Sequence, residues 1–138
     1  MADNTFMLEV VTPENILLSD EVQFVVVPGI EGELGMLKNH AAIVAGLKVG
    51  VLRYTMPDGS IRYMAISGGL MEVMDNDAKV LAETAEHGRD IDILRAKAAK
   101  ERAERRITER QDQISYVRAQ MALLRAIARI KANEMDKM

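Results

Sequence analysis

The residue pattern of this chain changes once, close to Asp90. Before that point, apolar and β-branched segments such as 6–11 and 60–66 are separated by turn residues, a pattern typical of a β-sandwich or barrel. After it, alanine, leucine, arginine, lysine and glutamate dominate, and all of them favour helix. The sequence therefore predicts a β-domain over residues 1–85, a linker over 86–90 with Asp90 as the helix N-cap, and helices over 91–138.

Length and composition limit the class of protein. A chain of 138 residues is long enough for one small domain with an appendage. The absence of cysteine excludes disulfides, a cysteine-ligated metal and a thiol nucleophile. No apolar run approaches the roughly 20 residues of a membrane span, and the first residues do not resemble a signal peptide. We therefore expect an intracellular chain that is at most peripheral to a membrane.

Charge divides the chain at the same place. Residues 1–84 carry 5 Lys/Arg and 12 Asp/Glu, a formal balance of −7, whereas residues 85–138 carry 13 and 9, a balance of +4. Two parts of opposite sign are expected to face different partners. The acidic first part argues against nucleic acid as a partner.

The helical part predicts an antiparallel hairpin that turns within residues 108–112. Its turn contains no glycine or proline, only Thr108 and Gln111 as a capping pair, so we hypothesise a compact and an extended state of the hairpin. Apolar residues at 3,4,3,4 spacing predict a seam of the second helix that packs on the first. The seam comprises Ile114, Val117, Met121, Leu124 and Ala128, and the matching stripe of the first helix comprises Ala96, Ala99, Ala103 and Ile107.

Three glycines at three-residue spacing, Gly29, Gly32 and Gly35, follow the apolar run 22–27. Such glycines are expected where a Cβ is not tolerated, through positive φ or close approach. The spacing fits neither the dinucleotide fingerprint nor a phosphate loop. A β-arch shaped only for packing and a loop that presents itself to a partner both remain open.

Three segments resemble the epsilon subunit of F-type ATP synthases. They are Val-Pro-Gly-x-x-Gly-x-x-Gly-x-Leu-x-x-His over 27–40, the Gly-Gly-x-x-Glu-Val strand within 66–73, and the run over 91–96. The sequence departs from many relatives at Lys38 and Ala42, where they carry proline. The resemblance implies a flattened β-sandwich of about ten strands followed by an antiparallel two-helix hairpin.

Arginines form two stripes on the predicted helices. Arg95, Arg102 and Arg106 are spaced i, i+7 and i+11, and the trio 118, 125 and 129 repeats that spacing. Two such stripes repel each other unless an anion or an acidic surface lies against them. From charge alone, solvated helix faces with local ion pairs remain the alternative.

The resemblance implies that these stripes bind ATP. Segment 91–96 is similar to the Ile/Leu-Asp-x-x-Arg-Ala motif through which bacterial epsilon subunits bind ATP, and guanidinium groups suit phosphate oxygens. No Walker lysine and no evident base accompanies them, so we expect binding without hydrolysis. Whether Mg²⁺ binds together with ATP remains open. The expected ATP-binding residues are Glu86, Ile91, Asp92, Arg95, Ala96, Arg102, Arg118, Arg125 and Arg129. We expect no catalytic residue and no metal ligand.

The resemblance further implies a non-catalytic rotor subunit in the central stalk of a proton- or sodium-translocating synthase, at the cytoplasmic face of the bacterial cell membrane. The sandwich would join the gamma subunit to the membrane ring of c subunits, and the extended hairpin would reach the beta and alpha subunits of the catalytic head and inhibit hydrolysis. Bound ATP would favour the folded hairpin. The expected ring contacts are Gly29, Ile30, Glu31, Gly32 and Glu33.

Two other functions remain open at this point. The chain could be an autonomous nucleotide-sensing module, or a basic helical adapter that docks on acidic partner surfaces without sensing nucleotide.

Overall fold

A computed structural model describes residues 4–109 and 112–138. These residues form ten strands, one short 3₁₀ helix and two α-helices, which confirms the predicted β-sandwich followed by a helical hairpin. The strands are β1 (Phe6–Val11), β2 (Ile16–Val22), β3 (Phe24–Gly29), β4 (Gly32–Met36), β5 (Ile43–Leu47), β6 (Gly50–Thr55), β7 (Ile61–Ile66), β8 (Gly69–Met74), β9 (Asp77–Ala82) and β10 (Ala85–His87). The helices are η1 (Gly88–Asp90), α1 (Ile93–Thr108) and α2 (Gln113–Asp136).

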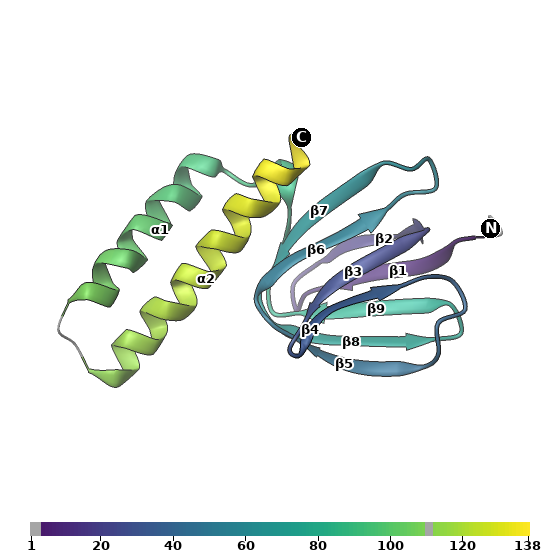
Figure 1. The fold of residues 1–138 in the computed structure, drawn as a ribbon, viewed down its shortest axis with the longest axis horizontal. Coiled ribbons are helices and arrows are strands. Elements are labelled where there is room, and N and C mark those ends of the chain that lie inside the picture. The colour runs from purple at the N-terminus through teal and green to yellow at the C-terminus, as the bar shows by residue number, and fades with distance from the viewer. Residues whose placement is uncertain (1–3, 110–111) are drawn as a thin grey trace.

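The strands form one sheet that folds over on itself (Figure 1). Its order is β10-β7-β6-β3-β5-β8-β9-β1-β2, with β4 paired to β3 outside this path. The two ends of the sheet meet where the Nε2 atom of His87 in β10 lies 2.8 Å from the Leu17 carbonyl oxygen of β2. This contact helps to hold the sandwich nearly closed.

The sandwich core follows from the alternation of its strands. In β1 every second side chain is buried, beginning with Phe6, because successive side chains of a strand point to opposite faces. Apart from Thr5, the largest fully buried side chains come from eight different strands, so both layers contribute to the core. They include Leu8, Val25, Met36, Leu52, Met64, Met71 and Val80.

The glycine-rich segment is the tight β-hairpin between β3 and β4. A Cβ on Gly29 would lie 2.6 Å from the Gly32 carbonyl oxygen, and Gly32 itself has a φ of 134°. A Cβ on Gly35 would lie 3.0 Å from the Phe24 ring. The expectation that a Cβ is not tolerated is confirmed at Gly29 by close approach and at Gly32 by positive φ, whereas at Gly35 a Cβ would make a tight contact with a side chain.

The passage from sandwich to helices differs in detail from the expected one. Strand β10 pairs with β7 and extends to His87, so the segment 86–90 consists of the end of β10 followed by η1. The prediction of Asp90 as N-cap is wrong. Because 88–90 form η1 and Ile91 is extended, α1 begins only at Ile93, and the side chain of Asp92 accepts its capping hydrogen bond from the Arg95 amide at 3.1 Å.

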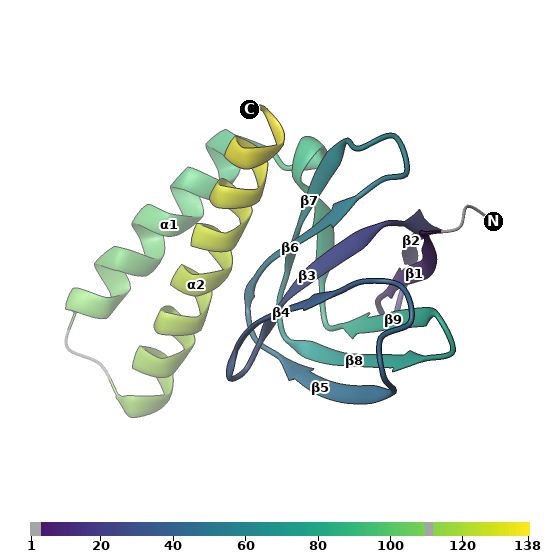
Figure 2. The same cartoon turned by 45° about the vertical axis from the view of Figure 1, so that its right-hand side comes forward.

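The two α-helices pack side by side, and α2 lies between α1 and the sandwich (Figures 1 and 2). The predicted stripe of α1 is confirmed, since Ala96 and Ala103 are buried and the other two members are half-buried. The predicted seam of α2 is wrong for its four large residues. Ile114, Val117, Met121 and Leu124 are 65%, 44%, 39% and 49% exposed.

Alanines take the place of that seam. Ala119 and Ala126, seven residues apart, are buried along α2, while Ala128 packs toward the sandwich together with Ala132. Ala96 and Ala103 are the buried residues of α1, while two other large apolar residues of α2, Leu123 and Ile130, are half-buried. Alanines therefore hold most of the fully buried positions of the two helices, in place of the large residues of the predicted seam.

The turn of the hairpin begins with the end of α1. Thr108 donates to the Arg105 carbonyl at 2.8 Å, so it belongs to the last turn of α1 and does not cap α2. The N-cap of α2 is Asp112, whose side chain accepts from the Ser115 amide at 2.8 Å. Gln111, the other member of the predicted capping pair, lies outside the described residues.

Candidate functional site

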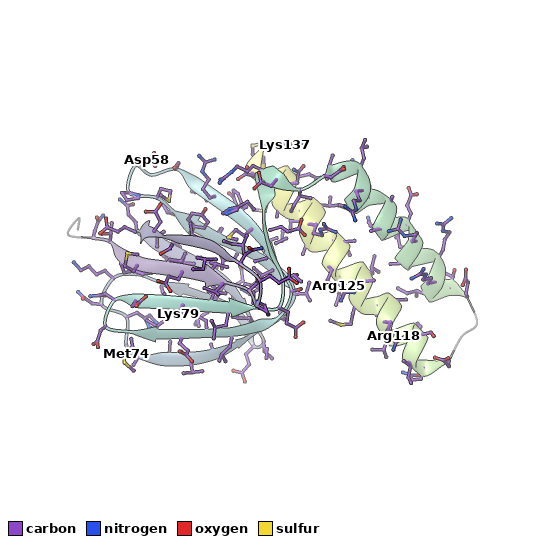
Figure 3. The ribbon with its side chains drawn as sticks, turned by 180° about the vertical axis from the view of Figure 1, so that it is seen from behind. Asp58, Met74, Lys79, Arg118, Arg125 and Lys137 are labelled. Atoms are coloured by element: carbon purple, nitrogen blue, oxygen red, sulfur yellow. The ribbon has the colours of Figure 1, made fainter. Side chains whose placement is uncertain are left out.

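A cavity of about 230 Å³ lies between α2 and the sandwich. Helix α2 supplies one wall, and the ends of β7 and the start of β10 with their flanking residues supply the other. Figure 3 shows Arg125 where α2 approaches the sandwich, and Arg118 farther along the helix toward its start. The lining residues are Ala65, Ile66, Ser67, Thr84, Glu86, Arg125, Ala128 and Arg129. Three of the predicted ATP-binding residues thus share one cavity.

An ion pair joins the two walls of this cavity. The Nε atom of Arg129 lies 2.8 Å from Oε1 of Glu86, and its Nη2 donates to Oε2 at 3.1 Å. One charge-assisted hydrogen bond and the close approach of Nε hold the guanidinium against the carboxylate. Glu86 therefore orients an arginine of the opposite wall.

Arg125 is the second cation of the cavity. Its side chain is exposed, and it forms no ion pair with the residues that the structure describes. With Arg129 balanced by Glu86, the lining keeps a formal charge of +1. The cavity is therefore suited to an anion.

The motif at the start of α1 has a structural role in this arrangement. Ile91 is 6% exposed and Ala96 is fully buried, both in an apolar cluster with Ala128 and Ala132 of α2. Asp92 caps α1. These residues hold the first turn of α1 against α2, so Ala96 fills space between the helices instead of leaving it open.

The remaining predicted arginines, Arg95, Arg102 and Arg118, are exposed and do not line the cavity. Helix geometry nevertheless relates them to it. An α-helix turns by about 100° per residue, so each arginine trio lies on one side, or flank, of its helix, next to the face formed by the buried alanines. Because the helices are antiparallel, these flanks form the same side of the hairpin, where Arg125 and Arg129 also lie.

Sequence reasoning missed three residues of this region. Ser67 and Thr84 form the sandwich wall of the cavity, and only the strand motif at 66–73 pointed toward the first. Asn133 is 2% exposed, and its Nδ2 donates to the carbonyl oxygens of Gly88 at 2.9 Å and Ile91 at 3.2 Å. Asn133 could have been found only as a polar residue on the buried face of the helix. That face is not known from the sequence.

The predicted ring contacts lie at the β3–β4 turn. Ile30 is 66% exposed, and Glu31, Gly32 and Glu33 are also exposed. Gly29 is buried, so it shapes the turn without offering surface. Glu33 forms an exposed ion pair with Arg53 at 3.1 Å.

A larger and more open cavity of about 800 Å³ lies on β5, β8 and β9. Val44 and Met74 on it are 66% and 64% exposed. Large apolar side chains that gather on an exposed sheet face are a mark of protein contact sites.

A polar cavity of about 450 Å³ lies beside β6 and η1. Burial raises the pKa of Tyr54 in its wall, although the positive charge and the hydrogen bond of Arg89 act in the opposite direction. Its lining carries Arg62 and Arg89 against two aspartates, so it has no excess of positive charge.

The described residues show neither a metal centre nor a membrane-spanning helix. Among them, no group of histidine and carboxylate side chains is arranged to hold a metal ion, and neither α-helix is long and apolar enough to cross a membrane.

Two protein families match the two structural parts. Residues 5–88 match the family described as "ATP synthase, Delta/Epsilon chain, beta-sandwich domain". Residues 89–134 match "ATP synthase, Delta/Epsilon chain, long alpha-helix domain". The boundary between the two matches falls within η1.

Solved structures share the fold. A chain of the Euglena gracilis mitochondrial ATP synthase superposes with a TM-score of 0.78 at 24% identity, over 87% of this chain and 76% of that one. A chain of the Tetrahymena thermophila enzyme gives 0.60 at 15% identity, over 92% and 95%. At these identities the likeness concerns the fold alone.

Closer relatives are found among bacteria. The ATP synthase epsilon chain of Syntrophomonas wolfei is 66% identical over 134 residues, which cover 97% of this chain and 98% of that protein. The epsilon chain of Desulfitobacterium hafniense strain Y51 is 51% identical over 128 residues, covering 93% and 96%. The chain therefore belongs to the epsilon-chain family of bacterial F-type ATP synthases.

Proposed function

We propose that this chain is a non-catalytic subunit of the central stalk of an F-type ATP synthase that translocates protons or sodium ions. It would join the gamma subunit to the ring of c subunits at the cytoplasmic face of the bacterial membrane. The observation that carries the proposal is the 66% identity to an ATP synthase epsilon chain over 97% of the chain. The Tetrahymena thermophila structure that shares the fold is one of a central stalk and c-ring, which supports the same placement.

The sandwich offers two surfaces for the stalk. The β3–β4 turn carries exposed Ile30 between polar neighbours, and we assign it to the ring. The apolar face with Val44 and Met74 is a second surface suited to protein contact, and we assign it to gamma.

Copurification tests the ring contact. Ile30→Asp should reduce capture of ring subunits by the reconstituted stalk, because it puts a charge into a surface that must lose its water. Ile16→Asp is the matched control, since Ile16 is 71% exposed on β2 at a different place on the sandwich. Equal capture by both variants would count against the turn as a ring contact.

We further propose that ATP is a regulatory ligand of the compact hairpin. The carrying observation is the positively charged cavity with Arg125, Arg129 and Glu86 between α2 and the sandwich. ATP that binds only the compact state would stabilise it by RT ln(1 + [L]/Kd), about 2.7 kcal/mol at a hundredfold excess over Kd. The same hairpin, when extended, would reach the beta and alpha subunits of the head and inhibit hydrolysis.

Calorimetric titration of the isolated chain tests the ligand. ATP should bind more tightly than ADP, and Arg125→Ala should weaken ATP about 10- to 100-fold, as expected for one charge-assisted contact of roughly 1.5–3 kcal/mol. Arg105→Ala, which removes an exposed arginine of α1 outside both trios, should leave the affinity unchanged. Titration with and without Mg²⁺ shows whether the metal accompanies the nucleotide.

A second candidate is the basic helical adapter. The exposed apolar stripe of Ile114, Val117, Met121 and Leu124 favours it, because this stripe lies beside Arg118 and suits a helix with acidic flanks. A chain that fails to bind ATP but still inhibits hydrolysis in the assembled enzyme would support the adapter.

A further inference from the structure

The sandwich wall of the 230 Å³ cavity carries a pair of hydroxyl groups. Oγ of Ser67 and Oγ1 of Thr84 are hydrogen-bonded to each other, and the Ser67 amide donates to the Thr84 carbonyl at 3.0 Å. Ser67 is 6% exposed. The backbone contact fixes the two hydroxyls in place before any ligand arrives.

The pair has hydrogen-bonding capacity to spare. The two hydroxyl groups carry two protons, and the hydrogen bond between them uses only one of these protons. Within the part of the chain that the structure describes, neither hydroxyl has a further partner. One O–H group is therefore available to donate to a ligand at the cavity wall.

The opposite wall supplies positive charge. Arg125 has no ion pair among the described residues, whereas Arg129 is balanced by Glu86. An oxygen-rich anion placed in the cavity can accept from the guanidinium on one side and from a hydroxyl on the other. Phosphoryl oxygens accept both kinds of hydrogen bond.

The size of the cavity limits what it holds. Whole small-molecule sites usually enclose about 300–1,000 Å³. The cavity, at about 230 Å³, suits part of a nucleotide rather than all of it. The remainder would lie along the arginine flank of the hairpin.

We propose that the Ser67–Thr84 hydroxyl pair and Arg125 are two sides of a subsite for one phosphoryl group of the nucleotide. This inference rests on the proposed function, since it assigns residues to the same ATP site. It adds two hydroxyl groups of the sandwich to a site for which the sequence named only Glu86 outside the helical part. A phosphoryl group bound there ties α2 directly to the sandwich, so ligand binding and docking of the hairpin are one equilibrium.

The decisive variant is Thr84→Val, which keeps the shape of the side chain and removes its hydroxyl. ATP should bind about 10-fold more weakly, the effect of one hydrogen bond to a charged group. Thr84→Ser keeps the hydroxyl and should stay within about twofold of the natural chain. Thr84 is exposed, and thermal unfolding of each variant verifies that the fold is kept.

Docking is measured on the same variants. Because the sequence contains no cysteine, Glu14→Cys and Gln120→Cys can carry a fluorophore pair on the sandwich and on α2. ATP should increase energy transfer, and Thr84→Val should move the midpoint to an ATP concentration about 10-fold higher. Ser67→Ala provides a second, independent removal of the pair.

Inorganic tripolyphosphate identifies which part of the nucleotide the pair contacts. It should compete with ATP, and Thr84→Val should weaken both by the same factor. If Thr84→Val weakened ATP but not tripolyphosphate, the hydroxyls would contact the sugar or base and the phosphoryl subsite would be overturned.

Two other results separate this inference from the proposed function. If Arg125→Ala weakens ATP while Thr84→Val and Ser67→Ala do not, the subsite is wrong and the ATP site stands. If the natural chain binds no ATP, the regulatory ligand is wrong and the subsite falls with it.

Discussion

Asn133 hydrogen-bonds to Gly88, and this contact joins the last turns of α2 to the segment that leads out of the sandwich. Its Nδ2 donates to the Gly88 carbonyl at 2.9 Å and also to the Ile91 carbonyl at 3.2 Å. With 2% exposure, the amide is removed from water. The compact hairpin is therefore held at its base by a specific polar contact as well as by apolar packing.

Asn133→Ala should loosen the compact hairpin. It leaves the buried Ile91 carbonyl without its side-chain donor, which costs about 1–3 kcal/mol. Urea unfolding monitored by the helical circular dichroism signal measures the effect. Glu134→Ala changes the next, exposed residue and should be nearly neutral; equal losses in the two variants would show that Asn133 has no special role.

Gly88→Ala should displace α2 from the sandwich. A Cβ at this position would lie 2.5 Å from the Ala132 carbonyl oxygen, a backbone atom that cannot rotate away. We expect a cost of about 1–3 kcal/mol, as for other overpacked sites. Amide hydrogen exchange should become faster in α2 while the sandwich is unchanged.

Asp90→Ala is the control for that experiment, because Asp90 is an exposed residue of the same short helix. If the amides of α2 were equally protected from exchange in Gly88→Ala, the segment at residue 88 and α2 could move apart at no cost in stability.

Substitutions at two nearby residues of α2 should differ in their effect on the free energy of unfolding. Leu124 is 49% exposed, so Leu124→Gln should change the free energy of unfolding by less than about 0.5 kcal/mol. Ala126 is 2% exposed, so Ala126→Leu should cost about 1–3 kcal/mol through overpacking. Chemical denaturation of the two variants compares them directly, and the reverse order would restore the 3,4,3,4 seam as the helix contact.

Acid should loosen the start of α2. The hydrogen bond from the Ser115 amide holds the pKa of Asp112 below its ordinary value of 3.8. A carboxyl group with a lowered folded-state pKa stabilises the fold above its unfolded pKa, and this contribution is lost as pH falls below about 3.8 through the folded value. Exchange of the Ser115 amide should therefore speed up in that range relative to the pH dependence of free peptides.

Asp112→Asn is the control for the acid experiment. Asparagine is also a good N-cap but does not titrate, so the variant should show no such acid step. A step of equal size in both chains would assign it to another group.

The sequence by itself determined the order of the two parts along the chain, a β-domain followed by helices. The change of pattern near Asp90 separated strands from helices, and the glycine spacing at 29, 32 and 35 marked the β3–β4 hairpin. Both are local signals, because strand alternation, helix propensity and the freedom of glycine act over a few residues. The motifs that carried the family resemblance lie in the same local elements.

The sequence did not determine which face of α2 is buried. Periodicity selects the stripe of large apolar residues, but Ala119 and Ala126 make the helix contact and leave Met121 and Leu124 exposed. Burial of a helix face depends on how both packing partners fit together, which the pattern of one helix cannot reveal. Only the packed hairpin decides between the two faces.

The cavity was likewise settled by tertiary structure alone. Glu86 and Arg129 are 43 residues apart in the chain. Ser67 directly follows β7 and Thr84 directly precedes β10, the strand that pairs with β7. Sequence motifs could nominate the arginines, because guanidinium chemistry is a property of single residues. Their union with two hydroxyls exists only because α2 docks on the sandwich, a contact between segments far apart in the chain.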